Sequence, residues 1–169
     1  VKVYFTKAKI VLVTNQQYDI RKSAFLKTLP LVDSVWLSID GVEKTFEYIR
    51  RGAKWKRTLR FLEDLVEAVP EEVRRQKFHI QFTLSSENYF DLPKIYEIRD
   101  KYSLSSVRYN LVQEWKGEKL NYHLKYDDKV FESMKLYKDD LMGVGGWQFK
   151  DCFWPYEGIF IDAYGDIRH

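Results

Sequence analysis

Polar residues of the types that hold small ligands follow three apolar runs of the sequence. The three strings are Thr14-Asn15, Ser38-Ile39-Asp40-Gly41 and Ser85-Ser86-Glu87-Asn88. In a parallel α/β sheet the carboxyl ends of all strands lie at one edge, and such folds bind their ligands there. The sequence therefore predicts a small-molecule site built from these strings.

Ser38 and Arg50 are the pair with the clearest chemistry, and they lie twelve positions apart. A hydroxyl donates one hydrogen bond from a strand end, while a guanidinium can bind two oxygens at once, so the pair suits a carboxylate or a ribose. The alternative is an ordinary strand end followed by a solvated arginine on a helix. Taken alone, the two residues favour that alternative, because serine-aspartate-glycine turns are common.

The elements that must position these residues alternate along the chain. Runs of β-branched and alternating apolar residues predict strands over residues 9–14, 33–38, 77–84 and 106–112. Helical spacing, with Asp19 as a cap and Pro30 and Pro70 as ends, predicts helices over residues 19–29, 43–49, 55–69 and 91–102. Each strand is followed by at least one helix, and right-handed crossovers then require a parallel sheet. The expected fold is α/β, about half of a (β/α)₈ barrel.

The character of the sequence changes beyond Trp115. Residues 127–141 have a helical pattern, a glycine cluster follows at 143–146, and a β-hairpin pattern begins at Cys152. We expect two parts: a partial barrel over residues 1–142 and the beginning of a small module over residues 143–169.

Composition limits the classes of function. The formal net charge is only +3, from 28 basic and 25 acidic side chains, so a nucleic-acid partner is not expected. The basic run at residues 50–60, which includes Trp55, is interpreted as the exposed side of a helix, with a nucleic-acid patch as the weaker alternative. No apolar stretch is long enough to span a membrane, and no signal-like segment is visible, which favours a cytoplasmic protein.

Cys152 is the single cysteine of the chain and cannot form an intramolecular disulfide. Its aromatic neighbours suit a buried thiol as well as a metal-bound sulfur.

The three histidines lie far apart, so a zinc site is not expected, and His79 is interpreted as an ordinary half-exposed side chain. No catalytic acid or base is identified.

Together the motifs resemble those of the radical S-adenosylmethionine enzymes that carry a SPASM or twitch extension. Residues 11–15 are similar to the strand that usually ends in Thr-Asn-Gly, although Gln16 replaces the glycine. Residues 35–41 are similar to the next strand with its Ser-x-Asp-Gly ending, and Arg50 keeps the spacing of that family from Ser38. This spacing is the most specific match.

The resemblance implies that Ser38, Arg50, Asn88 and Asn15 contact S-adenosylmethionine and that Leu111 lines its adenine pocket. It also implies that Cys152 begins a module for an auxiliary iron–sulfur cluster, of which the next cysteine would follow His169. The CxxxCxxC motif that holds the [4Fe–4S] cluster is absent from the chain and is expected upstream of Val1. We therefore expect a fragment that is cut at both ends and is inactive alone.

For the intact protein, the resemblance implies reductive cleavage of S-adenosylmethionine and hydrogen abstraction by a 5′-deoxyadenosyl radical. An electron-donor protein would be a partner, and a peptide or protein would be the substrate. The alternative hypothesis is a non-catalytic α/β module that keeps the nucleotide-side edge as a binding or interaction surface. A CxxxCxxC motif in the parent gene would separate the two.

Overall fold

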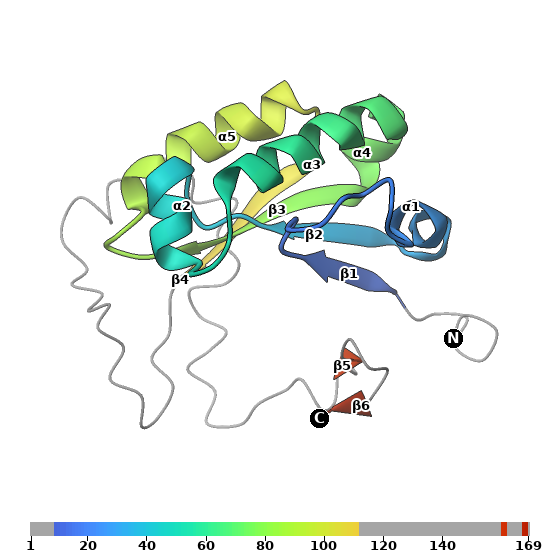
Figure 1. Ribbon diagram of the computed structural model, residues 1–169, viewed down its shortest axis with the longest axis horizontal. Coiled ribbons are helices and arrows are strands. Elements are labelled where there is room, and N and C mark those ends of the chain that lie inside the picture. Colours follow the sequence, from blue (N-terminus) through green and yellow to red (C-terminus); the bar gives the residue numbers. More distant parts are fainter. Residues whose placement is uncertain (1–8, 112–159, 162–166, 169) are drawn as a thin grey trace.

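The protein is described here by a computed structural model, which covers residues 9–111, 160–161 and 167–168. Its centre is a four-stranded parallel sheet in the order β1-β2-β3-β4 (Figure 1). The strands are β1 (Val11–Thr14), β2 (Ser34–Ser38), β3 (Phe78–Leu84) and β4 (Ser106–Leu111). The predicted α/β class and parallel sheet are confirmed, and the sheet is consistent with part of a (β/α) barrel.

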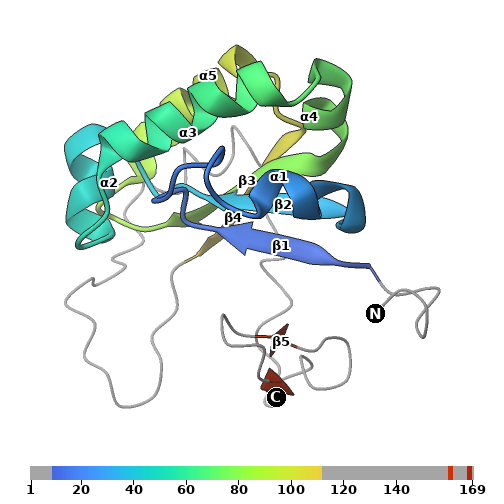
Figure 2. The same ribbon diagram turned by 45° about the vertical axis from the view of Figure 1, so that its right-hand side comes forward.

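Helices connect the strands, and α3, α4 and α5 lie over one face of the sheet (Figures 1 and 2). The helical segments are α1 (Phe25–Thr28), η1 (Leu29–Leu31), α2 (Glu43–Ile49), α3 (Trp55–Ala68), α4 (Glu71–Lys77), η2 (Tyr89–Asp91) and α5 (Leu92–Lys101). Within the described residues, no helix is long and apolar enough to cross a membrane.

The core lies between the sheet and these helices. Alternate residues of the strands are fully buried on this side, as in Leu37, Ile80 and Tyr109, and they pack with buried helix residues such as Leu62 and Ile95. Each large apolar side chain buried in this way contributes about 1.5–3 kcal/mol. The core therefore fixes which side of every strand faces the helices.

The opposite side of the sheet, which we call the open face, carries the other set of alternating residues. All of its side chains are half-buried or exposed within the described part of the chain, and Val13 is 55% exposed. The residues of the open face are Val11, Val13, Ser34, Trp36, Ser38, His79, Gln81, Thr83, Ser106, Arg108 and Asn110. Three of these residues are apolar and eight are polar, and the face ends at the carboxyl edge of the strands.

The helix predicted over residues 19–29 is wrong in its first half. Asp19 does not cap a helix; its Oδ1 accepts a hydrogen bond from the backbone N–H of Arg21 at 2.9 Å. Such a local side-chain contact competes with helix formation, and the helical turns begin only at Phe25.

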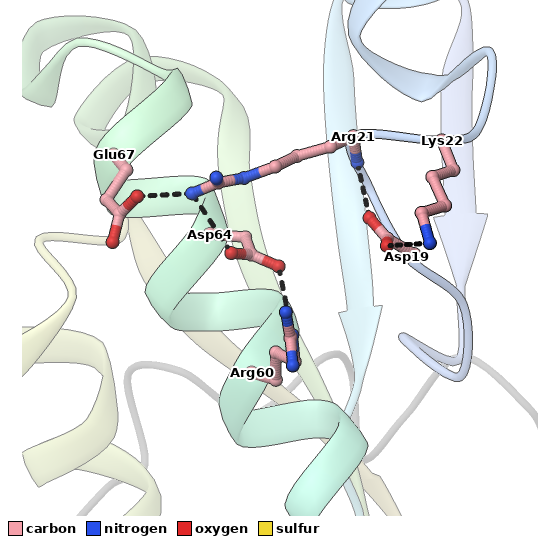
Figure 3. Close-up of polar contacts among 6 residues, drawn as sticks. All are labelled: Asp19, Arg21, Lys22, Arg60, Asp64 and Glu67. Carbon is pink, nitrogen blue, oxygen red and sulfur yellow. Dashed lines mark hydrogen bonds and ion pairs between the residues drawn. The ribbon is translucent and has the colours of Figure 1, made fainter.

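Charged side chains connect this turn to α3 (Figure 3). The Arg21 guanidinium lies 3.1 Å from Asp64 and also pairs with Glu67, while Arg60 lies 3.7 Å from the other oxygen of Asp64. The Asp64 carboxylate is buried, but both arginines are more than half exposed, so each pair contributes roughly 0–1 kcal/mol.

A second difference is the helix α4, which the sequence pattern did not indicate. Pro70 ends the preceding helix as predicted, but it also starts the next one, since Val73 and Arg74 donate backbone hydrogen bonds to its carbonyl at 3.1 Å. Glu71 and Glu72 in the first turn and Lys77 in the last turn suit the helix dipole.

A short antiparallel ladder joins β5 (Phe160–Ile161) and β6 (Ile167–Arg168); the rest of the predicted module over residues 143–169 lies outside the described residues. The predicted helix over 127–141 and the glycine cluster at 143–146 lie outside the described residues.

Candidate functional site

A hollow of about 450 Å³ lies at the carboxyl ends of β1 and β2. It brings together Asn15 and Ser38, two of the residues predicted to bind a ligand, and its remaining lining is Leu12, Val13, Thr14 and Tyr18. Sequence reasoning missed Tyr18, although the aromatic ring lies only four positions after the strand-ending Thr14.

The Tyr18 hydroxyl is oriented by Thr14, whose own hydroxyl donates a hydrogen bond to it at 3.1 Å. Burial raises the pKa of Tyr18, and the hydrogen bond from Thr14 offsets only part of this effect. The phenol is therefore protonated at neutral pH and keeps its proton for donation to a ligand.

Gln16 replaces the glycine of the Thr-Asn-Gly pattern to which this strand end was compared. Its backbone conformation is one that glycine adopts more readily than other residues. Its φ is +57°, in the left-handed region that favours glycine. The side-chain amide nitrogen donates to the carbonyl of Thr14, and the backbone N–H contacts the Thr14 hydroxyl at 3.2 Å. These local hydrogen bonds hold a non-glycine residue in a turn that would otherwise cost about 1–2 kcal/mol.

Asp40 and Arg50 form the charged centre of the carboxyl edge. Oδ2 of Asp40 lies 2.6 Å from the Arg50 guanidinium, and Oδ1 accepts a hydrogen bond from the backbone N–H of Thr83 at 2.7 Å. The Asp40 side chain is 8% exposed and that of Arg50 is 27% exposed. Nε of Arg50 is buried and has no hydrogen-bond partner among the described residues. The sequence indicated Asp40 only as a turn former, whereas the structure makes it the residue that orients Arg50.

Asn88 connects the ends of β2 and β3 from a fully buried position. Its amide nitrogen donates to the carbonyls of Asp40 at 3.0 Å and Thr83 at 2.8 Å, and its oxygen accepts from the backbone N–H of Ser85 at 2.7 Å and from the Ser85 hydroxyl at 3.1 Å. All these bonds lie within the protein. The structure therefore gives Asn88 a positioning role for Asp40, and the predicted contact with a cofactor stays a prediction.

Gly41 allows the chain to turn sharply directly after Asp40. Its φ is +142°, and an added Cβ atom would lie 3.1 Å from Cγ2 of Thr45 and 3.2 Å from the backbone nitrogen of Phe46. The next residue, Val42, donates its N–H to Asp91 at 3.1 Å. The loop that carries Asp40 is thus fixed on both sides.

The remaining predicted residues are only partly located. Leu111 ends β4 and pairs with Leu84, at the same edge as Ser38 and Asn15, but its side chain is outside the described part. Cys152 lies outside the described residues altogether. No group of metal-ligating side chains occurs in the described ranges 9–111, 160–161 and 167–168.

His79 lies on the open face below this edge. Its Nδ1 is 2.9 Å from the Ser106 hydroxyl, and its ring packs edge-on near Trp36 at 6.5 Å between centroids. Burial lowers the pKa of His79, and the nearby charge of Arg108 lowers it further. The imidazole is therefore neutral at pH 7.

This depressed pKa predicts an acid-sensitive contribution of His79 to stability. The unfolded chain takes up the proton more readily than the folded chain, so stability is lost as the pH falls below about 6.5, the ordinary pKa of histidine. We expect the melting temperature to fall less between pH 8 and pH 5.5 in His79→Gln than in the unchanged protein. Thermal denaturation at both pH values measures this, and identical pH dependence in the two proteins would contradict it.

Comparison with known proteins shows the fold. No family model matches the sequence, and no curated protein matches it. The similar solved structures include SuiB of Streptococcus suis and the same protein bound to S-adenosylmethionine. Each has a TM-score of 0.58 and 17% sequence identity over 79% of this chain and 30% of SuiB. The chain thus spans about 30% of the length of SuiB, and over that span the two share a fold.

Proposed function

We propose that this chain is part of a radical S-adenosylmethionine enzyme and that the carboxyl edge of its sheet holds the cofactor. The observation that carries the proposal is the Asp40–Arg50 pair, which holds a guanidinium at the carboxyl edge, beside the residue two positions after Ser38. The spacing of twelve positions between Ser38 and Arg50 is also the most specific sequence similarity to this family. The fold shared with SuiB, which has been solved with S-adenosylmethionine bound, supports the same proposal.

The residues at the edge fit the polar groups of this cofactor. Arg50 uses one terminal nitrogen for Asp40 and is 27% exposed, which leaves the other available for a carboxylate. The half-buried Ser38 hydroxyl, the exposed Asn15 amide and the Tyr18 phenol border one hollow and can donate to carboxylate or ribose oxygens. Leu111, at the end of β4, would lie against the adenine.

The iron–sulfur cluster does not fit the residues of this chain. A [4Fe–4S] cluster needs several cysteine thiolates, whereas the sequence has one cysteine. We propose that the parent protein supplies the CxxxCxxC motif elsewhere and that Cys152 belongs to an auxiliary site. Bound beside such a cluster, S-adenosylmethionine would supply the radical chemistry for removing a hydrogen atom from a substrate, here proposed to be a peptide or protein. An electron-donor protein is the implied partner.

Replacing Arg50 tests the cofactor site. Arg50→Ala removes a charge-assisted contact of about 1.5–3 kcal/mol, so we expect the affinity for S-adenosylmethionine to fall roughly 10-fold to 100-fold. Isothermal titration calorimetry of the purified, anaerobically reconstituted parent protein measures this. Arg51→Ala is the matched control, because Arg51 is the exposed neighbour of Arg50. The Arg51→Ala protein should bind S-adenosylmethionine with unchanged affinity.

Unchanged affinity in a folded Arg50→Ala protein would remove Arg50 from the site. Circular dichroism of the variant checks folding, since the change also leaves Asp40 without its guanidinium. The non-catalytic alternative makes a different prediction. If the protein binds S-adenosylmethionine but releases no 5′-deoxyadenosine with a strong reductant, the edge serves binding alone.

A further inference from the structure

The open face carries a row of polar side chains across three strands. Ser38 on β2 pairs in register with Gln81 on β3, and Gln81 pairs with Arg108 on β4. Residues paired in register point to the same side of a parallel sheet, and neighbouring strands are about 4.8 Å apart. Arg108 and Gln81 therefore occupy neighbouring positions on the face opposite the helices, in the row that ends at Ser38.

The charge of Arg108 is not balanced within the described residues. The Arg108 side chain is exposed, and no ion pair or hydrogen bond joins it to any of them. The open face, as defined above, contains no aspartate or glutamate. His79, the nearest titratable group on it, is neutral and contacts Ser106. The face thus presents one positive charge surrounded by neutral hydrogen-bonding groups.

We infer that this row binds a carboxylate of the substrate, so that the proposed peptide substrate carries an acidic residue at this position. A guanidinium binds the two oxygens of a carboxylate, and the Gln81 amide can donate a further hydrogen bond. One positive charge complements one carboxylate. The inference rests on the proposed function, because the row matters as a substrate site only if Ser38 and the carboxyl edge hold S-adenosylmethionine.

The location of the row adds to this assignment. Ser38 belongs to the row and also lines the hollow at the carboxyl edge. A carboxylate held by Arg108 would therefore lie two strands away from Ser38, on the same face of the sheet. Half-buried Trp36 and exposed Val13 flank the row on that face, and they offer apolar contact to the rest of a peptide.

Nuclear magnetic resonance of the whole protein tests the inference with small probes. We expect N-acetyl-glutamate N-methylamide to shift the Arg108 Nε and Gln81 side-chain signals, with an affinity at least fivefold higher than that of the neutral glutamine analogue. Arg108→Gln should abolish the difference between the two probes. Arg57→Gln, which changes an exposed arginine of α3, should preserve it.

Several results would overturn the carboxylate site. These are equal binding of the charged and neutral probes, binding that survives Arg108→Gln, and equal or stronger binding of dimethyl phosphate, which would indicate a nucleic-acid backbone instead.

Calorimetry with S-adenosylmethionine separates this inference from the proposed function. If the cofactor fails to bind while the glutamate probe still depends on Arg108, the proposed function is wrong, and the open face remains a carboxylate site.

Discussion

Replacing Asn88 by alanine is expected to lower the free energy of unfolding by about 3 kcal/mol. The change removes hydrogen bonds to Ser85, Asp40 and Thr83 inside the protein, and each buried group left without a partner costs about 1–3 kcal/mol. Asn88 is fully buried, so water cannot replace the lost amide without opening the loop. Urea denaturation measures the loss.

Asn15→Ala is the matched control for Asn88→Ala. Asn15 belongs to the same edge but is exposed, and its side chain accepts only a 3.2 Å hydrogen bond from the backbone of Gln17. Its replacement should change stability by less than about 0.5 kcal/mol. Equal losses in the two variants would show that burial and the hydrogen bonds of Asn88 are not what holds the loop.

Asn88→Ala should also weaken the binding of the proposed cofactor, S-adenosylmethionine. Without the amide, the backbone carbonyl of Asp40 loses its partner, and the carboxylate that orients Arg50 keeps only its hydrogen bond from Thr83. A loss of affinity for S-adenosylmethionine in Asn88→Ala, measured where the protein is still folded, would distinguish this positioning role from a purely structural one.

Arg74→Met is expected to be comparably destabilising, by about 3 kcal/mol. Arg74 is 6% exposed and donates to the carbonyls of Tyr102 at 3.0 Å, Val66 at 3.3 Å and Val69. These carbonyls belong to the carboxyl-terminal ends of α3 and α5, where a positive charge is favourable. Methionine fills part of the space but leaves the carbonyls without donors.

The adjacent Arg75 provides the control for Arg74. Arg75 pairs with Glu71 at 2.7 Å, one turn away on α4, and both side chains are more than half exposed. Arg75→Met should cost less than about 1 kcal/mol, as exposed pairs usually do. Chemical denaturation of the two variants side by side checks the contrast, and similar midpoints would refute the role assigned to Arg74.

The strands and the longer helices could be predicted because their residues alternate or repeat at helical spacing. In β3, every second residue from Phe78 to Leu84 is buried, as the alternation indicated. The short helix α4 has only one apolar residue, Val73, so it lacked a periodic signal. The turn at Asp19 was missed because a capping residue also forms local turns, and the sequence does not show which contact is made.

The site could be predicted by its place in the fold but not by its contacts. Asn15 and Ser38 meet because parallel strand ends share one edge, which is a consequence of topology. The role of Asp40 depends on Thr83 and Asn88, which lie more than 40 residues away in the chain. No local pattern reveals such long-range hydrogen bonds. The place of Arg108 beside Gln81 and Ser38 could not be predicted for the same reason, since these neighbours come from other strands.

The strand order has a consequence for how the chain folds as it is synthesised. Each strand of the sheet pairs only with those immediately before and after it in sequence, so no strand must be inserted later between two that have already joined. Each strand and helix can dock on its predecessor as it leaves the ribosome, and ordering proceeds from the amino terminus. The row of Ser38, Gln81 and Arg108 would then be completed last, when β4 joins β3.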